Sequence, residues 1–330
     1  MKPAMSNGSP VPKLKPPALR PGDTIGIVAP ASNLQKSLLE IGRIALEKMG
    51  YRTTYGESIL DQDLYFAGSL DRRVRELQEM FERDDVHAIL CARGGYGCNY
   101  LLPRLNLAKV ALHPKIFMGY SDITTLLTWF TDQVGLVTFH GPMLTKDFRP
   151  DGIDTASWGN AVGACSHWEM AFSNQHDVKP LLEGSAEGTL YGGCLSMLAA
   201  SLGTPYEINT SGTILFIEDL ATKPYQIDRM LMQLKLAGKF QGVKGIMFGE
   251  MVDCIQAAKQ GYSLEEVILR VVGDLGIPIA FGLHSGHVTS GNITLPIGIR
   301  ASLQVTSTEV SLQFLEAATI PMAVPSRTNV

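Results

Sequence analysis

A chain of 330 residues is longer than a single hydrophobic core usually serves, so two domains are expected. Hydrophobic residues make up 45% and charged residues 18%, the net charge is -4, and no Lys/Arg-rich run occurs, which argues against a nucleic acid or an anionic membrane as partner. No window approaches about eighteen apolar residues, so no membrane-spanning helix is predicted.

The N-terminal residues and the cysteines indicate in which cellular compartment the protein is expected. Residues 1–20 are rich in proline and polar residues and lack the apolar core of a secretory signal, so a disordered lead-in is expected. The cysteines are odd in number and scattered, which favours buried free thiols in a reducing cytosol over a disulfide framework. They are Cys91, Cys98, Cys165, Cys194 and Cys254. A cytoplasmic location is therefore expected.

Short apolar runs alternate with helical patterns through the first half of the chain. Leu38, Ile41, Ala45 and Met49 recur at helical spacing and predict a helix over 35–50. The alternation predicts a parallel sheet covered on both faces, with ligands bound beyond the carboxyl ends of its strands. Strands are predicted at 24–29, 51–55, 86–92, 115–118 and 137–141, and helices at 35–50, from Ser69 and from Asp122.

The second half is predicted to be a mixed domain. Residues 146–185 show little periodicity and are expected to be a linker or flap. A capping box at 263–266 opens a helix, and 301–315 alternates like an antiparallel hairpin. Further strands are predicted at 188–191, 213–217, 243–248, 277–281 and 293–295.

The expected fold is therefore α/β. An N-terminal parallel-sheet domain of the flavodoxin- or Rossmann-like kind precedes a C-terminal mixed α/β domain with antiparallel strands. The expected boundaries are 1–20 for the lead-in, 21–145 for the N-terminal domain, 146–185 for the linker or flap, 186–320 for the C-terminal domain and 321–330 for a tail.

The corner Gly119-Tyr120-Ser121-Asp122 stands between a buried strand and an apolar helix. A serine there is lifted out of the sheet, and the N–H group after it lies at a helix N-terminus, where negative charge is favoured. This is the situation of a nucleophile elbow. Taken alone, a serine that only caps the helix is the simpler interpretation.

Acyl transfer by a serine needs a general base, an acid that orients the base, and donors for the oxyanion. Three of the seven histidines lie at or just past strand ends beside a glycine: His140, His284 and His287. The carboxylates placed similarly are Glu218 and Glu250.

The turn Arg93-Gly94-Gly95-Tyr96-Gly97 has two interpretations. Its N–H groups can approach an anion, or its glycines can simply serve a tight turn with positive φ. Neither a G-x-G-x-x-G nor a P-loop pattern occurs, which disfavours a nucleotide cofactor. Neither H-E-x-x-H nor paired C-x-x-C occurs, so no metal is expected.

Together these stretches resemble the LD-carboxypeptidase family of serine peptidases (family S66), which includes cytoplasmic muramoyltetrapeptide carboxypeptidases and microcin-C immunity peptidases. The matching pieces span about residues 20 to 300 in the right order. They are GDTIGIVAPAS at 22–32, ARGGYG at 92–97, GYSDIT at 119–124, HGPM at 140–143, IEDL and PYQIDRML within 217–231, and GHVTSGNITLPIG at 286–298.

Carried over by position, the resemblance implies that Ser121 is the nucleophile, Glu218 the orienting acid and His287 the base. The oxyanion donors fall on the backbone of Asp122 and of Gly94 or Gly95. The corner lacks the second glycine of G-x-S-x-G, as Ile123 stands there, but the family's own elbow reads G-[YF]-S-D. The substrate's free carboxylate needs a cation, for which Arg93 and Arg229 are candidates.

The resemblance implies a serine carboxypeptidase, without metal or cofactor, that releases the C-terminal D-alanine of murein tetrapeptide in peptidoglycan recycling. The bond cleaved would follow L-lysine or diaminopimelate, and by analogy the protein could form a homodimer. An alternative is a microcin-type peptidase acting on a peptidyl-nucleotide, with an aromatic loop in 146–185 as clamp. A third, less favoured alternative is a non-catalytic protein that binds an anion at Gly94-Gly95.

Overall fold

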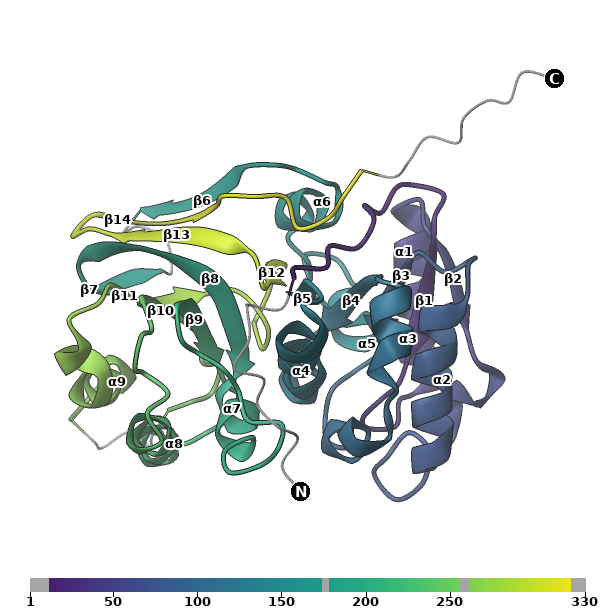
Figure 1. The fold of residues 1–330 in the computed structure, drawn as a ribbon, viewed down its shortest axis with the longest axis horizontal. Helices are drawn as coiled ribbons and strands as arrows, with labels where there is room; N and C mark the ends of the chain where they lie inside the picture. The colour runs from purple at the N-terminus through teal and green to yellow at the C-terminus, as the bar shows by residue number, and fades with distance from the viewer. Residues whose placement is uncertain (1–11, 174–177, 256–260, 322–330) are drawn as a thin grey trace.

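The described residues of the chain form two lobes, each built on one β-sheet (Figure 1). The structure, a computed structural model, describes residues 12–173, 178–255 and 261–321. Within these ranges no helix has the length and apolar character needed to span a bilayer. The two-sheet α/β architecture agrees with the predicted fold class.

The N-terminal lobe contains a six-stranded sheet in the order β12-β5-β4-β3-β1-β2. Strands β1 to β5 are parallel, and their order, 2-1-3-4-5, is that of flavodoxin-like sheets. The sixth strand, β12 (Leu295–Ile297), comes from far along the chain and pairs antiparallel with β5. The parallel strands are β1 (Thr24–Val28), β2 (Arg52–Tyr55), β3 (Ala88–Cys91), β4 (Ile116–Gly119) and β5 (Thr138–His140).

Helices cover both faces of this sheet. The first and fifth helices pack on one face, and the second, third and fourth pack on the other. The α-helices are α1 (Lys36–Lys48), α2 (Leu70–Glu82), α3 (Leu107–Leu112), α4 (Thr124–Val134), α5 (Leu144–Asp147) and α6 (Thr155–Val162). Short 3₁₀ turns are η1 (Glu57–Leu60), η2 (Cys98–Tyr100), η3 (Leu102–Arg104) and η4 (Ser121–Ile123).

The helix predicted at 35–50 is confirmed as α1, but of the recurring apolar residues only Ala45 and Met49 pack against the core. Leu38 and Ile41 are 38% and 53% exposed, and the buried residues are Leu39, Gly42 and Leu46. A β-carbon added at Gly42 would lie 2.5 Å from the carbonyl oxygen of Leu144, so the glycine allows α1 to approach α5 closely. Apolar residues occur on two sides of α1, and their spacing alone does not show which side packs.

The C-terminal lobe contains an eight-stranded sheet in the order β6-β14-β13-β8-β9-β10-β11-β7. Strands β8 to β11 run parallel, whereas the flanking strands run antiparallel. The strands are β6 (Trp168–Ser173), β7 (Lys179–Leu182), β8 (Gly184–Cys194), β9 (Thr213–Glu218), β10 (Gly245–Gly249), β11 (Ile279–Leu283), β13 (Arg300–Val305) and β14 (Glu309–Phe314).

Helices α7 (Leu195–Ala200), α8 (Pro224–Leu236) and α9 (Leu264–Val272), with the 3₁₀ turn η5 (Gly273–Leu275), complete this lobe. The capping box predicted at the start of α9 is confirmed, because Ser263 and Glu266 exchange their hydrogen bonds. The predicted hairpin is confirmed as β13 and β14.

Two segments differ from their expected character. Residues 146–185, expected to be a linker or flap, contribute α6, β6 and β7, and their Trp168 stacks on Phe314 with 4.1 Å between ring centroids. Residues 12–20, expected to be disordered, are held to the fold by apolar contacts and backbone bonds, such as Leu14 N–H to Gly135 O at 2.8 Å. Residues 1–11, 174–177 and 322–330 of the expected lead-in, flap and tail lie outside the described residues.

The carboxyl ends of the parallel strands of both sheets meet between the lobes. Ser121 follows β4, His140 ends β5 and Glu218 ends β9. A crossover formed by residues 284–294 leaves β11 of one sheet and enters β12 of the other. Any residue on this crossover is therefore positioned by both lobes at once.

Hydrogen bonds between α4 and β8 also tie the lobes together. Tyr191 Oη donates to Asp132 Oδ2 at 2.7 Å, and the Cys194 N–H donates to Thr124 Oγ1 at 3.0 Å. Burial raises the pKa of Asp132 to about 7, although the Tyr191 hydrogen bond acts in the opposite direction.

We expect the free energy of unfolding of Asp132→Asn, relative to that of the wild type, to increase by on the order of 2 kcal/mol as the pH rises from 5 to 8. Between the unfolded pKa near 3.8 and the folded pKa of about 7, the folded state binds a proton that the unfolded state has lost. Wild-type stability therefore falls across this window, whereas asparagine does not titrate. Urea unfolding at several pH values measures the difference, and a difference independent of pH would contradict the expectation.

Candidate active site

Ser121 has a strained backbone. It follows β4 at the first position of η4 and has a φ of +63°, a region that non-glycine residues adopt rarely and at a cost of about 1–3 kcal/mol. Helix-capping residues instead have extended backbones and accept a hydrogen bond from the first turn. Neither η4 nor α4 has such a side-chain cap. The corner therefore has the geometry of a nucleophile elbow rather than of a capping serine.

The glycine-rich turn after β3 lies directly against this corner. A β-carbon added at Gly94 would lie 2.7 Å from Ser121 Cβ and 3.0 Å from its Oγ. Gly95 has a φ of +102° and lies instead against Ser32, whose Oγ would be 2.3 Å from an added β-carbon. Only a residue without a side chain fits beside Ser121.

Two buried side chains hold the turn in place. Arg73 Nη1 donates to the carbonyl oxygens of Pro30 and Gly97, at 2.9 and 3.0 Å. Asp122 Oδ2 accepts the N–H of Cys98 at 2.8 Å, which joins the turn to the residue after Ser121. Among the hydrogen bonds of the described residues, none uses the N–H of Gly94 or Asp122. These two donors are therefore available to a ligand.

Glu218 and His287 form a buried pair. Glu218 is fully buried and His287 is 8% exposed. Glu218 Oε2 accepts His287 Nδ1–H at 2.6 Å and the His287 backbone N–H at 3.2 Å. This bond fixes the imidazole tautomer and leaves Nε2 as the nitrogen that can accept a proton.

The pair shifts both pKa values. Burial alone would raise the pKa of Glu218, but the charge and N–H groups of His287, with a contribution from His140, hold it well below its ordinary value. Burial lowers the pKa of His287, yet the charge and hydrogen bond of Glu218 outweigh this effect, so that the pKa is raised above its ordinary value near 6.5.

The His287 ring reaches the Ser121 corner through Tyr120. The Tyr120 and His287 rings make an edge contact with 5.0 Å between centroids, and Tyr120 directly precedes Ser121. The hydrogen bonds of the described residues include none between Ser121 Oγ and His287. Such bonds are often long in the absence of substrate and tighten when it binds.

The other candidates from the sequence have different partners. Glu250 accepts the N–H and hydroxyl of Thr289, at 3.1 and 3.0 Å. Arg93 Nη1 donates to the carbonyl oxygen of Asn33 at 2.9 Å, and the Arg229 guanidinium lies 5.5 Å from the Tyr225 ring centroid on α8. The contacts of the described residues do not place either arginine at Ser121.

Two residues near the pair were not chosen from the sequence. Lys146 on α5 places Nζ 5.7 Å from the Tyr120 ring centroid, and its charge acts to lower the pKa of His287. His140 lies on the other side of Glu218, with Nε2 3.7 Å from Oε1. In the sequence, the HGPM motif and the position at a strand end made His140 one of the candidate histidines. No sequence pattern pointed to Lys146.

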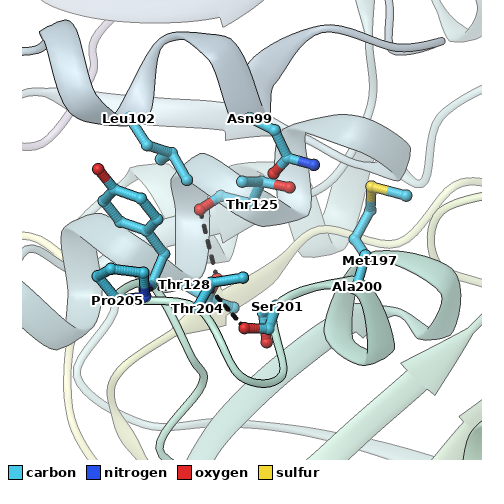
Figure 2. A pocket seen from close by; sticks show the side chains of 10 residues that line it. Asn99, Leu102, Thr125, Thr128, Met197, Ala200, Ser201, Thr204 and Pro205 are labelled. Carbon is cyan, nitrogen blue, oxygen red and sulfur yellow. Dashed lines mark hydrogen bonds between the residues drawn. The ribbon is translucent and has the colours of Figure 1, made fainter.

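A cavity of about 360 Å³ lies between the lobes but away from these groups. Figure 2 shows its lining side chains facing one another from the two lobes, with Asn99 and Thr125 on one side and Met197 and Ser201 on the other. Neither Ser121 nor the Glu218–His287 pair lines it, so this cavity is not the space beside the proposed reactive groups.

Comparison with known proteins identifies the family. The chain matches the model of the LD-carboxypeptidase N-terminal domain over residues 25–141 and that of the LD-carboxypeptidase C-terminal domain over residues 187–303. It is 41% identical over 293 residues to a probable murein peptide carboxypeptidase of Bacillus subtilis, covering 88% of this chain and 91% of that protein. It is 30% identical over 325 residues to the microcin C7 self-immunity protein MccF of Escherichia coli, covering 88% and 93%.

A solved structure agrees in fold. The muramoyltetrapeptide carboxypeptidase from Oxalobacter formigenes superposes with a TM-score of 0.81 at 30% identity, covering 91% of this chain and all of that one. The chain therefore belongs to the LD-carboxypeptidase family of serine peptidases and is a serine-type carboxypeptidase.

Proposed function

We propose that the protein removes the C-terminal D-alanine from murein tetrapeptide, with Ser121, His287 and Glu218 as a catalytic triad, in cell-wall recycling. The observation that carries the proposal is the buried Glu218–His287 pair beside the strained Ser121 corner. The substrate class is supported by relatives named murein peptide and murein tetrapeptide carboxypeptidase. We place the reaction in the cytoplasm, where free thiols such as those of this chain stay reduced.

In the proposed mechanism, His287 Nε2 takes the Ser121 hydroxyl proton as the oxygen attacks the carbonyl carbon before D-alanine. Glu218 holds the imidazole in the required tautomer and stabilises the imidazolium that forms. His287 then gives the proton to the amine of D-alanine, and the C–N bond breaks. Water attacks the acyl-enzyme with His287 again as base and releases the shortened peptide. The groups used here come from one chain, so the mechanism does not require the homodimer suggested by analogy.

The oxyanion would be held by the N–H groups of Asp122 and Gly94. Gly94 and Gly95 were equal candidates from the sequence, but Gly94 lies against Ser121 and Gly95 against Ser32. A donor pair that flanks the nucleophile stabilises the charge that develops on the carbonyl oxygen during attack.

The terminal carboxylate of D-alanine would be held by a cation. Arg93, beside Gly94, and Arg229 remain candidates from the sequence. Lys146 is better placed than Arg229, because it lies over Tyr120 and acts on His287. A cation at this position would favour substrates that end one residue after the cleaved bond, which is the defining property of a carboxypeptidase.

A peptidyl-nucleotide substrate is the alternative, and the likeness to MccF favours it. An aromatic clamp from 146–185 would require exposed rings, but Trp158 and Trp168 are both buried. Trp158 packs on Tyr51 and Phe148, and Trp168 packs on Phe314. Competing the two substrates against one enzyme preparation separates these alternatives.

We expect Ser121→Ala and His287→Ala each to reduce D-alanine release from murein tetrapeptide by about a thousandfold or more. Release by the wild type should survive EDTA, because no proposed step uses a metal. Labelling by a serine-directed phosphonate should occur in the wild type and be lost in Ser121→Ala. Full turnover by Ser121→Ala would refute the mechanism, and absence of both turnover and labelling in the wild type would favour an anion-binding protein.

Gly94→Ala should lower kcat/KM by about tenfold or more while the fold persists, since the added methyl group collides with Ser121. Gly159→Ala is the matched control, because its β-carbon meets no atom within 4 Å and its position is in α6. The control should retain activity and be neutral or slightly stabilised. Kinetics and thermal melting of both variants measure this, and equal activities would contradict the proposed place of Gly94.

Lys146→Met should raise KM for murein tetrapeptide by about tenfold with little change in kcat, because methionine keeps the chain length but removes the charge. Arg229→Met, which removes a cation from an exposed part of α8, is the control and should leave KM unchanged. Arg93→Met tests whether Arg93, the remaining candidate, binds the terminal carboxylate of the substrate. If only Arg93→Met raises KM, the carboxylate is held by Arg93 and not by Lys146.

A further inference from the structure

His140 is a fully buried histidine that the proposed mechanism leaves without a role. It ends β5, and its neighbours include the rings of Phe216 and Tyr120, at 5.0 and 6.0 Å between centroids. Its Nδ1 lies 3.0 Å from Ser285 Oγ, and its Nε2 lies 3.7 Å from Glu218 Oε1. The backbone at Gly286 closes the space beside both groups, since an added β-carbon would lie 2.7 Å from His140 Cε1 and 2.8 Å from Glu218 Cδ.

The hydrogen bonds of Ser285 determine where His140 carries a proton. Ser285 Oγ lies 2.8 Å from the carbonyl oxygen of Ile293, which can only accept. A hydroxyl group has one proton to donate. Both contacts of Ser285 are hydrogen bonds only if its proton goes to Ile293 and His140 Nδ1 donates to it. His140 Nδ1 is therefore protonated.

The remaining nitrogen faces a carboxylate. Glu218 uses Oε2 for His287, and Oε1 has no hydrogen-bond partner among the described residues; the same is true of His140 Nε2. In a neutral His140 with the proton on Nδ1, a bare Nε2 lone pair would face the carboxylate inside the protein, where such repulsion is poorly screened. A second proton, on Nε2, converts this repulsion into attraction.

We propose that His140 is a protonated positioning residue, an imidazolium that shares the charge of Glu218 with the catalytic base His287. This inference rests on the proposed function of His287. The buried site then holds one carboxylate between two imidazole rings, of which His140 keeps its charge in the resting enzyme and His287 gains and loses a proton during catalysis. Its role is to keep the orienting acid ionised without forcing the base into its protonated, inactive form.

The charges around His287 show why a second partner matters. Glu218 and Asp219 at the end of β9 favour its imidazolium form, and Lys146 on α5 opposes it. The buried phenol of Tyr120 contacts both imidazole rings. If His287 alone balanced Glu218, it would hold its proton to higher pH and would be available as a base over a narrower pH range. A cationic His140 on the far side of the carboxylate offsets part of this attraction.

The protonation state can be measured directly in the resting enzyme. In ¹⁵N-histidine-labelled full-length protein, the His140 ring signals are assigned by their loss in His140→Gln. We expect both His140 nitrogens to carry protons in the resting enzyme at pH 7, as the contacts of Nδ1 with Ser285 and of Nε2 with Glu218 require. This measurement needs no substrate, so it gives an answer even if the proposed D-alanine release fails its own test.

The pH dependence of kcat/KM tests the role. Activity falls at low pH as His287 becomes protonated, and we expect this acid limb to move to higher pH by about one pH unit in His140→Gln. Ser285→Ala keeps the imidazole but removes the acceptor of Nδ1–H, which lets His140 become neutral with its proton on Nε2. Its acid limb should move in the same direction by a smaller amount, with the rate at the pH optimum largely retained.

Ser285→Ala keeps the inference testable if His140→Gln does not fold, because loss of the Nδ1–H acceptor shifts the His140 ring signals and so assigns them in the wild-type spectrum. A structural role for His140 predicts a lower melting temperature and a lower rate at every pH, with the acid limb unmoved. That result, or a wild-type spectrum with one unprotonated His140 nitrogen at pH 7, would overturn the inference. An acid limb that moves upward in the folded variants, together with a doubly protonated His140, would establish it.

Discussion

The buried charge of Glu218 is one of the contacts that join the two lobes. Glu218 is fully excluded from solvent at the end of β9, and an ionised carboxylate in such a place costs several kcal/mol unless it is paired and hydrogen-bonded. Its partners do not come from its own strand. His287 reaches it from the crossover between the sheets, and His140 faces it from the last parallel strand of the other lobe. The carboxylate therefore has both histidines beside it only when the lobes are docked, so that the contact that stabilises the ionised acid also assembles the groups of the proposed triad.

The Ser121 side of the site relies on backbone strain and close packing instead of charge. Ser121 keeps an unfavourable backbone because the sheet precedes it, α4 follows it, and the glycine-rich turn presses against it. Arg73 and Asp122, both buried, hold that turn in place with hydrogen bonds to the backbone of Gly97 and Cys98. Preorganised N–H groups of this kind need no rearrangement when charge develops on a substrate. One half of the site is thus rigid by packing, and the other half is held by electrostatics.

Local patterns predicted much of this fold, and spatial relations account for what they missed. Most strands and the main helices lie close to their predicted ranges, since each depends on a short apolar run or a cap such as Ser263. The buried face of α1 does not follow from its apolar spacing, because its packing depends on Gly42 fitting against Leu144, a residue on another helix. Strands β6 and β7 have weak patterns of their own and are stabilised by β14 and β11, which come much later in the chain. The resemblance to a family named Ser121, Glu218 and His287, but only the structure shows that His140 Nε2 lies 3.7 Å from Glu218 Oε1 and that the charge of Lys146 acts on His287.

The placement of β12 also determines when during synthesis the enzyme can become active. Domains that emerge from the ribosome generally fold in order from the N-terminus. Here the nucleophile's own sheet lacks its edge strand until Leu295–Ile297 is available, and β5 would meanwhile present unpaired backbone groups. The same late segment brings His287 across. On the proposed mechanism, a nascent chain long enough to display Ser121 is therefore still without its base, and activity appears only once the chain has been made through Ile297.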